Sequence, residues 1–182
     1  MIHNKVLKNF YFIDDFNKDH IRSLNKNISI IYRNYTKKYN EEKILEIKKF
    51  CKNIKKKFFL ANDINLTNKL NLDGAYIPAF NNSLSVFKLK NKNMTLLGSA
   101  HNLKEINQKK KQGIDIIFIA PTFKVIKSNN FLDVIKFNIL ANLLDGKAVA
   151  LGGINKNNIK KIKILNCYGF ASISYIKEYN KI

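Results

Sequence analysis

Polar residues that could bind an anion stand directly behind short apolar runs of this chain. Gly152 and Gly153 end the run Lys147–Leu151, and a helix-like pattern begins behind them. Paired glycines at a strand end let bare N–H groups approach a ligand, and a following helix N-terminus favours a phosphate. A tight turn is the simpler role for such a pair, so the phosphate role depends on the pattern of the rest of the chain.

Two more polar positions have the chemistry of a binding site. Arg33 follows the run Ile28–Tyr32, so its guanidinium could hold an anion; a charge that merely ends a strand is an equal alternative. Asp63 follows the run Phe58–Ala61 and could bind a divalent cation if substrate phosphates supply further ligands. The alternative for Asp63, and for Asn62 before it, is a helix N-cap.

Two residues could transfer protons or neutralise charge. His101 is the only histidine at a predicted strand end, where it could carry protons near neutral pH. A surface or capping histidine is an equal alternative. Lys127 lies in the longest irregular loop, Pro121–Asn130, and could reach an anion at the strand ends. In so basic a chain, an ordinary loop lysine is the simpler interpretation.

Composition limits the class of protein. The 182 residues are 46% hydrophobic, which predicts one ordered domain over residues 1–182. No apolar run approaches the ~18 residues of a membrane span, and no apolar segment follows the charged first residues. Cys51 and Cys167 lack metal-ligand spacing and are expected to be buried, reduced thiols. We therefore expect a cytoplasmic protein without a membrane span or signal peptide.

The net charge of +20 raises the question of a nucleic-acid partner. Lysines are spread along the whole chain, with local runs at Lys55–Lys57 and Lys109–Lys111. Lysines on outward helix faces are ordinarily solvated, and neither an RNP-like aromatic strand nor a zinc finger is present. We therefore expect an anionic small substrate rather than nucleic acid.

Short apolar runs alternate with stretches of helical period from end to end. They predict strands at residues 10–13, 28–32, 58–61, 74–77, 94–98, 114–120, 147–151 and 170–173. Eight such strands predict a single (β/α)8 TIM barrel, compact with short loops because the chain is short for that fold. An open doubly wound sheet is the competitor, and the lack of G-x-G-x-x-G behind the first strand disfavours it.

Helix signals fit the same pattern. Asn102 followed by Glu105 has capping-box spacing, and Gly113 ends the helix that they begin. Further helices are predicted at Phe131–Leu144 and Asn155–Leu165 and from near Ser174. In a barrel the polar strand ends gather at one mouth, where active sites form.

The strand ends carry a set of motifs in a fixed order. These are Tyr11–Asp15, Ala61–Asp63, Asp73–Ile77, Leu97–Asn102, Gly113–Asp115, Ala120–Pro121, Ala150–Ile154 and Gly169–Ser174. Together they resemble the thiamine phosphate synthase family, with its thiazole tautomerase (TenI-like) relatives. Asp73–Ile77, for example, resembles the D-G-V-H-L run of the family, and Ala150–Ile154 its A-I-G-G-I turn.

The resemblance implies a (β/α)8 barrel that joins an aminopyrimidine diphosphate to a thiazole phosphate, with Mg²⁺ and loss of diphosphate. The expected partners are these small phosphorylated substrates, and a homo-oligomer stays open. By position, the resemblance implies that Arg33 and Ser99 hold the diphosphate, that Asn62 contacts the pyrimidine and that Asp63 binds the metal. It also implies a thiazole phosphate site formed by Gly152 and Gly153 with the amides of Ile173 and Ser174.

Several positions depart from the family pattern. Ile31 stands where the family has glutamine, and Tyr35 where it has lysine. Asn81 replaces the second metal carboxylate, so the expected Mg²⁺ has one protein carboxylate fewer. The loop Ala120–Lys127 is one residue short and lacks its central threonine, although Lys124 or Lys127 could replace part of the lost charge. Such losses predict weakened transition-state stabilisation.

Three hypotheses follow from these residues. The leading one is a thiamine phosphate synthase-family protein with weakened coupling activity. The second is thiazole tautomerisation, in which His101 stands where the tautomerase relatives have their catalytic histidine and no metal is required. The third is a non-catalytic protein that binds a phosphate ligand and has lost the chemistry.

Overall fold

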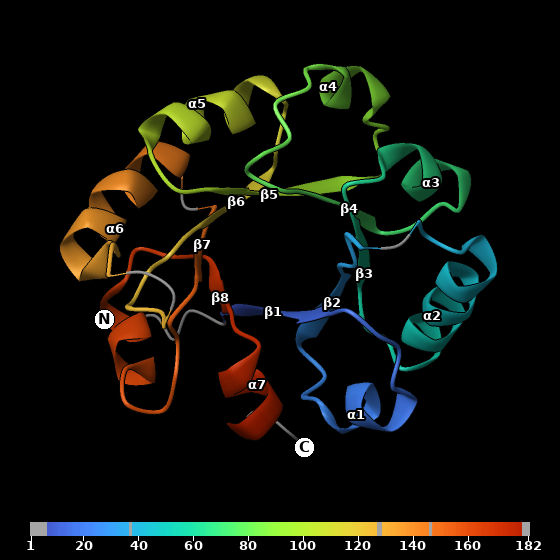
Figure 1. Ribbon diagram of the computed structural model, residues 1–182, viewed down its shortest axis with the longest axis horizontal. Helices are drawn as coiled ribbons and strands as arrows, with labels where there is room; N and C mark the ends of the chain where they lie inside the picture. Colours follow the sequence, from blue (N-terminus) through green and yellow to red (C-terminus); the bar gives the residue numbers. More distant parts are fainter. Residues whose placement is uncertain (1–6, 37, 127–128, 146, 180–182) are drawn as a thin grey trace.

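The computed structural model describes residues 7–36, 38–126, 129–145 and 147–179. Within this part of the chain, eight parallel strands close into a barrel in sequence order, and β8 pairs with β1. Figure 1 shows the strands as a closed ring with the helices around its outside. The predicted (β/α)8 fold is confirmed.

Most elements lie close to their predicted positions. The strands are β1 (Lys8–Ile13), β2 (Ile28–Tyr32), β3 (Phe58–Ala61), β4 (Gly74–Ile77), β5 (Thr95–Ala100), β6 (Ile116–Ile119), β7 (Ala148–Leu151) and β8 (Gly169–Ala171). The α-helices are α1 (Lys18–Ser23), α2 (Glu41–Asn53), α3 (Ile64–Lys69), α4 (Ser85–Leu89), α5 (Leu103–Lys111), α6 (Asp133–Ala141) and α7 (Ser174–Tyr179). The 3₁₀ segments are η1 (Asn142–Leu144) and η2 (Ile159–Ile164). In the described ranges, no helix has the length and apolarity that a bilayer crossing requires.

Aromatic side chains fill the inside of the barrel. Phe10 and Phe12 of β1 point inward and pack edge to face on Phe118, with ring centroids 4.9 and 6.2 Å away. The alternate residues Tyr11 and Ile13 point outward and pack in the layer between barrel and helices. Because both faces of each strand are buried, the strands read as nearly unbroken apolar runs in the sequence.

One predicted helix is wrong. Behind β7, the stretch predicted as a helix at Asn155–Leu165 begins with turns and continues as the 3₁₀ segment η2. Asparagine side chains bind the backbone there: Asn155 N–H donates to Asn158 Oδ1 (2.9 Å), and Asn157 N–H donates to Asn155 Oδ1 (2.9 Å). Such local bonds compete with helix formation. The double glycine therefore lacks the α-helix N-terminus that the sequence predicted behind it.

Candidate functional site

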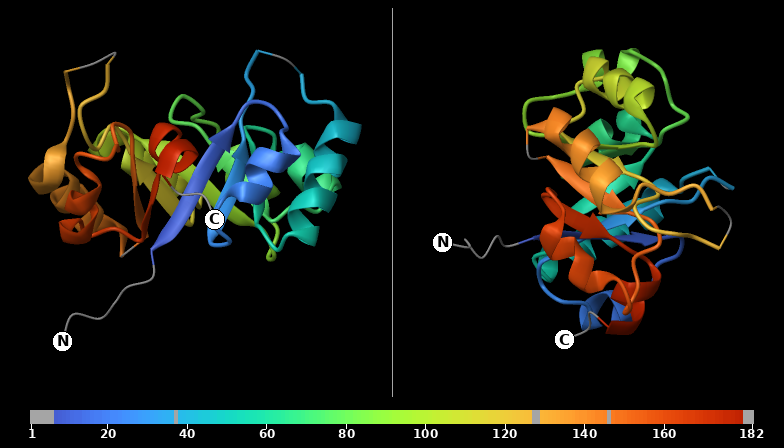
Figure 2. Two further views of the ribbon diagram at one scale, coloured as in Figure 1. Left: turned by 90° about the horizontal axis from the view of Figure 1, so that it is seen from below. Right: turned by 90° about the vertical axis from the view of Figure 1, so that its left-hand side faces the viewer.

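The predicted site residues that the structure describes lie at one end of the barrel. Parallel strands in a closed ring bring all their carboxyl ends to the same mouth, and the loops behind β2 and β6 rise on that side (Figure 2). The described members of the predicted set are Arg33, Asn62, Asp63, Ser99, His101, Gly152, Gly153, Ile173 and Ser174. Lys127, predicted to act with them, lies outside the described residues.

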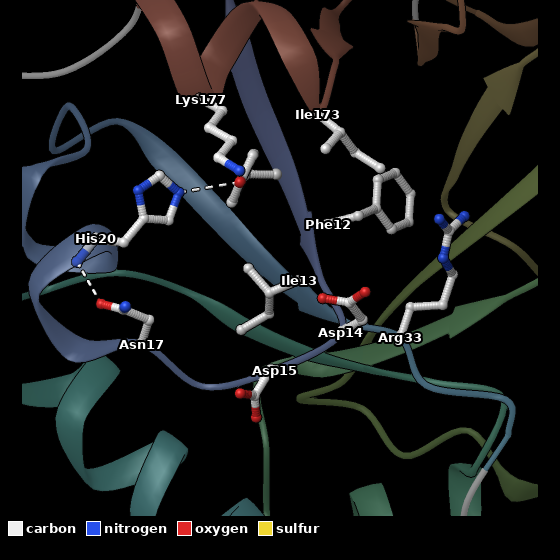
Figure 3. A pocket seen from close by; sticks show the side chains of 10 residues that line it. Phe12, Ile13, Asp14, Asp15, Asn17, His20, Arg33, Ile173 and Lys177 are labelled. Carbon is white, nitrogen blue, oxygen red and sulfur yellow. Dashed lines mark hydrogen bonds between the residues drawn. The ribbon is translucent and has the colours of Figure 1, made fainter.

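Arg33 faces the inside of the mouth. Its backbone N–H donates to Ile13 O (2.8 Å), and its guanidinium carbon lies 4.6 Å from the Phe12 ring centroid. Together with Asp14 and Ile173, Arg33 lines a cavity of about 390 Å³ (Figure 3). Two predicted phosphate ligands, from opposite ends of the sequence, thus share one cavity. A guanidinium stacked on an aromatic ring is held in orientation while its donors stay available for an anion.

Asn62 and Asn81 connect two loops of the mouth. Asn62 has a φ of +60°, a left-handed conformation that asparagine tolerates better than most residues. The Asn81 side-chain amide donates to Asn62 Oδ1 (2.7 Å), and Asn81 Oδ1 accepts from the Ser83 N–H (3.0 Å). Asn81 thus connects the loops in the place where the family resemblance has a carboxylate.

Asp63 is the N-cap of α3. Its Oδ1 accepts from the Leu66 N–H at 2.8 Å, as the capping alternative predicts. The described residues contain no group of three or more histidine, cysteine, aspartate or glutamate side chains that could hold a metal ion. Magnesium can be bound by one protein carboxylate when substrate phosphates and waters complete its shell. The donors therefore fit Mg²⁺ only as an ion that the substrate helps to hold.

Ser99 and Tyr76 form the floor below these loops. Ser99 is only 6% exposed, and its Oγ accepts from the Ala79 N–H (3.0 Å). Burial raises the pKa of Tyr76, while a hydrogen bond with Ser99 and the positive charge of Arg33 oppose that rise. Tyr76 was not among the site residues predicted from the sequence, although it occupies the histidine position of the D-G-V-H-L run.

An aromatic pair includes Tyr35, which stands where the family has lysine. Tyr35 and Phe80 meet edge to face with ring centroids 5.5 Å apart, and they are 49% and 64% exposed. Burial of the hydroxyl raises the pKa of Tyr35, so it is neutral at physiological pH. Tyr35 is one of the predicted departures from the family, whereas Phe80 was not predicted; its signal in the sequence is an aromatic residue directly before Asn81 in the turn behind β4.

The double glycine is required for close packing. Gly152 and Gly153 have φ values of +91° and +71°, and a Cβ on Gly153 would lie 2.3 Å from Phe123 O. The Phe123 N–H donates to Gly152 O (3.1 Å), which joins the β6–α6 loop to the turn. The simpler turn role therefore accounts for both glycines. In the described residues, the N–H groups of Gly153 and Ile173 donate no hydrogen bond.

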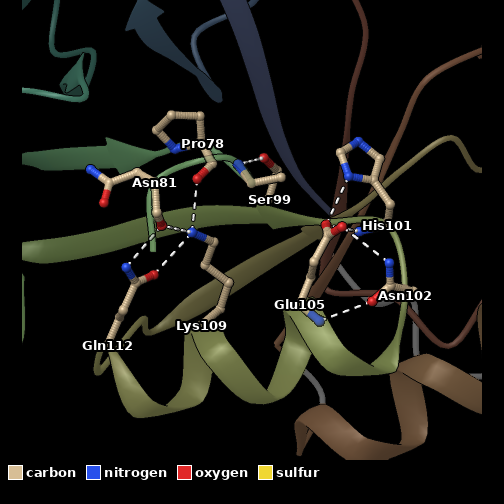
Figure 4. Close-up of polar contacts among 9 residues, drawn as sticks. Pro78, Asn81, Ser99, His101, Asn102, Glu105, Lys109 and Gln112 are labelled. Carbon is tan, nitrogen blue, oxygen red and sulfur yellow. Dashed lines mark hydrogen bonds and ion pairs between the residues drawn. The ribbon is translucent and has the colours of Figure 1, made fainter. Parts of the chain in front are cut away.

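His101 lies to one side of the mouth. Its Nδ1 is 2.8 Å from Glu105 Oε2, which also accepts from the His101 backbone N–H (2.8 Å) (Figure 4). Burial alone would raise the pKa of Glu105, but the hydrogen bonds and charge of His101 lower it overall. His101 lines a cavity of about 650 Å³ with Phe80 and Gln108, and it is absent from the lining of the Arg33 cavity. His101 and Arg33 thus line different cavities.

Comparisons with known proteins agree with this architecture. A family model described as thiamine monophosphate synthase matches residues 22–176. The thiamine-phosphate synthase of Pelagibacter ubique (strain HTCC1062) is 31% identical over 195 residues, covering 96% of this chain and 91% of that protein. The thiamine-phosphate synthase of Staphylococcus haemolyticus (strain JCSC1435) is 25% identical over 146 residues, covering 78% of this chain and 69% of that protein.

A solved structure resembles the chain as a whole. Thiamine phosphate pyrophosphorylase from Pyrococcus furiosus has a TM-score of 0.77, covering 97% of this chain and 90% of its own. Its sequence identity is 18%, so this likeness supports the fold alone.

Proposed function

Because the chain belongs to the thiamine monophosphate synthase family of transferases, we propose that it joins an aminopyrimidine diphosphate to a thiazole phosphate. The thiazole attacks the carbon that carries the diphosphate, a bond to that carbon forms, and the bond to diphosphate breaks. The products are thiamine phosphate and diphosphate. The observation that carries the proposal is the shared mouth of Arg33, Asn62 and Ser99 in a chain of this family.

The reaction requires the protein to position the substrates and to neutralise charge, and it requires no protein nucleophile. In the proposal, Arg33 binds the diphosphate, with its guanidinium held over Phe12. Ser99 adds a hydroxyl at the floor of the same end, and Asn62 contacts the pyrimidine. The side-chain contact between Asn62 and Asn81 supports this role, since it holds the Asn62 amide in one orientation.

The thiazole phosphate is proposed to bind near the ends of β7 and β8. The N–H groups of Gly153 and Ile173 have no hydrogen-bond acceptor in the described residues, and Ser174 begins α7. Bare N–H groups at such a position suit a phosphate oxygen. Ile173 also lines the Arg33 cavity, so the proposed sites for the diphosphate and for the thiazole phosphate would be close enough for two adjacent substrates.

Mg²⁺ is proposed to be held by Asp63 and substrate oxygens. When bound, it would offset negative charge on the leaving diphosphate. Asp63 contributes a carboxylate whose orientation is fixed by the cap of α3. Because Asn81 is neutral and Tyr35 carries no positive charge, we propose a lower coupling rate than a site with the carboxylate and the lysine of the family at these positions would give.

A second candidate function is thiazole tautomerisation by His101. The hydrogen bond to Glu105 favours it, because a carboxylate fixes the orientation of an imidazole that transfers protons. The separation of His101 from the Arg33 cavity weighs against it. The third candidate, a non-catalytic binder, keeps the phosphate contacts of the first.

We also propose a cytoplasmic location and small phosphorylated partners. Cys51 is a buried free thiol, which suits a reducing compartment. The proposed site accounts for an anionic substrate without nucleic acid.

Three assays on the purified chain separate the three candidates. The purified chain is incubated with both phosphorylated substrates and Mg²⁺, and thiamine phosphate is quantified beside the variant Arg33→Met. The proposal expects product above background and a loss of about 100-fold in the variant, the scale of removing one strong electrostatic contact. Product absent, with thiazole phosphate still raising the melting temperature, would leave the binder. Isomerisation of the thiazole substrate that His101→Gln abolishes would establish the tautomerase.

A further inference from the structure

The β4–α4 loop, residues 78–84, is held at the mouth by buried side chains of α5 rather than by its own contacts alone. We propose that Lys109 and Gln112 are positioning residues for the substrate site, because they fix the loop that presents Phe80 and Asn81 to the mouth. The inference depends on the proposed function for the identity of the substrate. Neither residue belongs to the site predicted from sequence.

The Lys109 ammonium donates two hydrogen bonds to this loop and one to Gln112. The side chain is fully buried at 0% exposure. Its Nζ donates to Pro78 O (2.8 Å), Asn81 O (2.7 Å) and Gln112 Oε1 (2.9 Å) (Figure 4). An ammonium has three donors, so each of them has an acceptor. A buried charge is tolerated when its donors are satisfied in this way.

Gln112 and Gln108 extend the same attachment. The Gln112 side-chain amide donates to Asn81 O and Ser83 O, at 2.9 Å each. Gln108 Nε2 donates to Asn82 O at 2.7 Å. Two side chains of α5 and its C-cap residue Gln112 thus hold the carbonyls of four loop residues. We call Gln108, Lys109 and Gln112 the α5 clamp.

The loop that the α5 clamp holds carries two side chains into the mouth. Asn81 donates to Asn62 Oδ1 on the loop behind β3, and Phe80 packs on Tyr35 behind β2. On the barrel side, the Ala79 N–H donates to Ser99 Oγ. A continuous set of contacts therefore runs from α5, through the loop, to Asn62 and Ser99 of the proposed substrate site and to Tyr35.

The chemistry of the α5 clamp makes it sensitive to a single change. Removing the Lys109 ammonium takes one of two donors from Pro78 O, which keeps the Asn81 N–H, and one of two from Asn81 O, which keeps Gln112 Nε2. It also takes the donor from the buried Gln112 Oε1, and a buried acceptor that loses its donor favours a shift of this attachment toward water. A shift of about 1 Å at a positioned group can cost up to about 100-fold in rate. In the described residues, no hydrogen bond joins this loop to the proposed thiazole phosphate end near β7 and β8.

The test compares Lys109→Met with Lys110→Met, a matched change at an exposed lysine of the same helix. KM and kcat are measured for both substrates well below the melting temperature of each variant. We expect Lys109→Met to raise KM for the pyrimidine diphosphate about tenfold and to leave KM for the thiazole phosphate within about twofold. Lys110→Met should match the wild type. Gln112→Met, which keeps Lys109, serves as a milder second variant if Lys109→Met does not fold.

Amide hydrogen exchange gives a readout that needs no turnover. Faster exchange confined to residues 79–84 in Lys109→Met, with the barrel strands protected, supports the α5 clamp even if the wild type proves to lack synthase activity. In that case the proposed function fails while the positioning of the loop stands. A lower melting temperature with unchanged loop exchange and unchanged KM for both substrates would overturn the inference and leave Lys109 a stability residue.

Discussion

The side-chain amide of Asn81 donates a 2.7 Å hydrogen bond to the side-chain oxygen of Asn62, and this bond joins the loops behind β4 and β3. The pairing affects metal binding, because both partners are neutral and the proposed metal ligand Asp63 directly follows Asn62 in the sequence. A carboxylate at position 81 would lose the donor to Asn62 and add an oxygen ligand of the kind Mg²⁺ prefers.

We therefore expect Asn81→Asp to strengthen Mg²⁺ binding. The Mg²⁺ concentration for half-maximal activity should fall about tenfold, on the scale of one added charged contact. Mg²⁺ should also raise the melting temperature of the variant more than that of the wild type when diphosphate is present, a readout independent of turnover. Asn82→Asp, an exposed change on the same loop, controls for added negative charge. Equal Mg²⁺ dependence in the two variants would contradict the expectation.

Tyr35 offers the reverse test, in which positive charge is restored. Tyr35→Lys removes the edge contact with Phe80 and places an ammonium at the mouth. We expect kcat/KM for the pyrimidine diphosphate to rise about threefold to tenfold at low ionic strength, and the gain to shrink with added salt. Tyr35→Met, which loses the same ring without adding charge, should give no gain. A gain that salt does not reduce would argue against charge as the cause.

Gly153→Ala tests the turn behind β7. The added Cβ would meet Phe123 O at 2.3 Å, and alanine is strained at a φ of +71°. We expect the free energy of unfolding to fall by about 1–3 kcal/mol, which denaturant titration would measure. A variant as stable as the wild type would show that the β6–α6 loop does not pack on this turn in solution.

Lys109 gives stability a defined dependence on pH. Burial lowers its pKa to about 8, against the opposing charge of Glu105, whereas a lysine in the unfolded chain titrates near pH 10.4. Between these values the unfolded chain binds a proton that the folded chain does not, so this group makes stability rise with pH. Below about pH 8 both states are protonated and the contribution is flat.

Subtracting Lys109→Met isolates this contribution, because the other titrating groups are common to both proteins. The difference in unfolding free energy should shift in favour of the wild type by up to about 1 kcal/mol per pH unit between roughly pH 8 and 10. Parallel stability curves over that range would contradict the lowered pKa.

The fold could be predicted from the sequence because every strand is buried on both faces. The run Phe58–Ala61 is apolar throughout and Ile28–Tyr32 is interrupted only by Ser29, and the two match β3 and β2 residue for residue. The prediction failed at Asn155–Leu165, where spaced isoleucines suggested a helix but asparagine side chains bind the backbone instead. The spacing of apolar residues carries no information about such side-chain–backbone hydrogen bonds.

The site was predictable only in part. Strand ends identified Arg33 and Asn62, since parallel topology alone places them at the mouth. Lys109 was taken as part of a solvated lysine run, yet it lies three residues after the buried Ile106, on the same helical face. The tertiary partners of its ammonium, carbonyls about thirty residues away, have no signal in local sequence.

The central claim is that this mouth couples two phosphorylated substrates. The most direct measurement follows thiamine phosphate and diphosphate together in one reaction of the purified chain with both substrates and Mg²⁺. We expect thiamine phosphate and diphosphate to appear in a one-to-one ratio and Arg33→Met to suppress both. Diphosphate released without thiamine phosphate, or neither product above background, would contradict it.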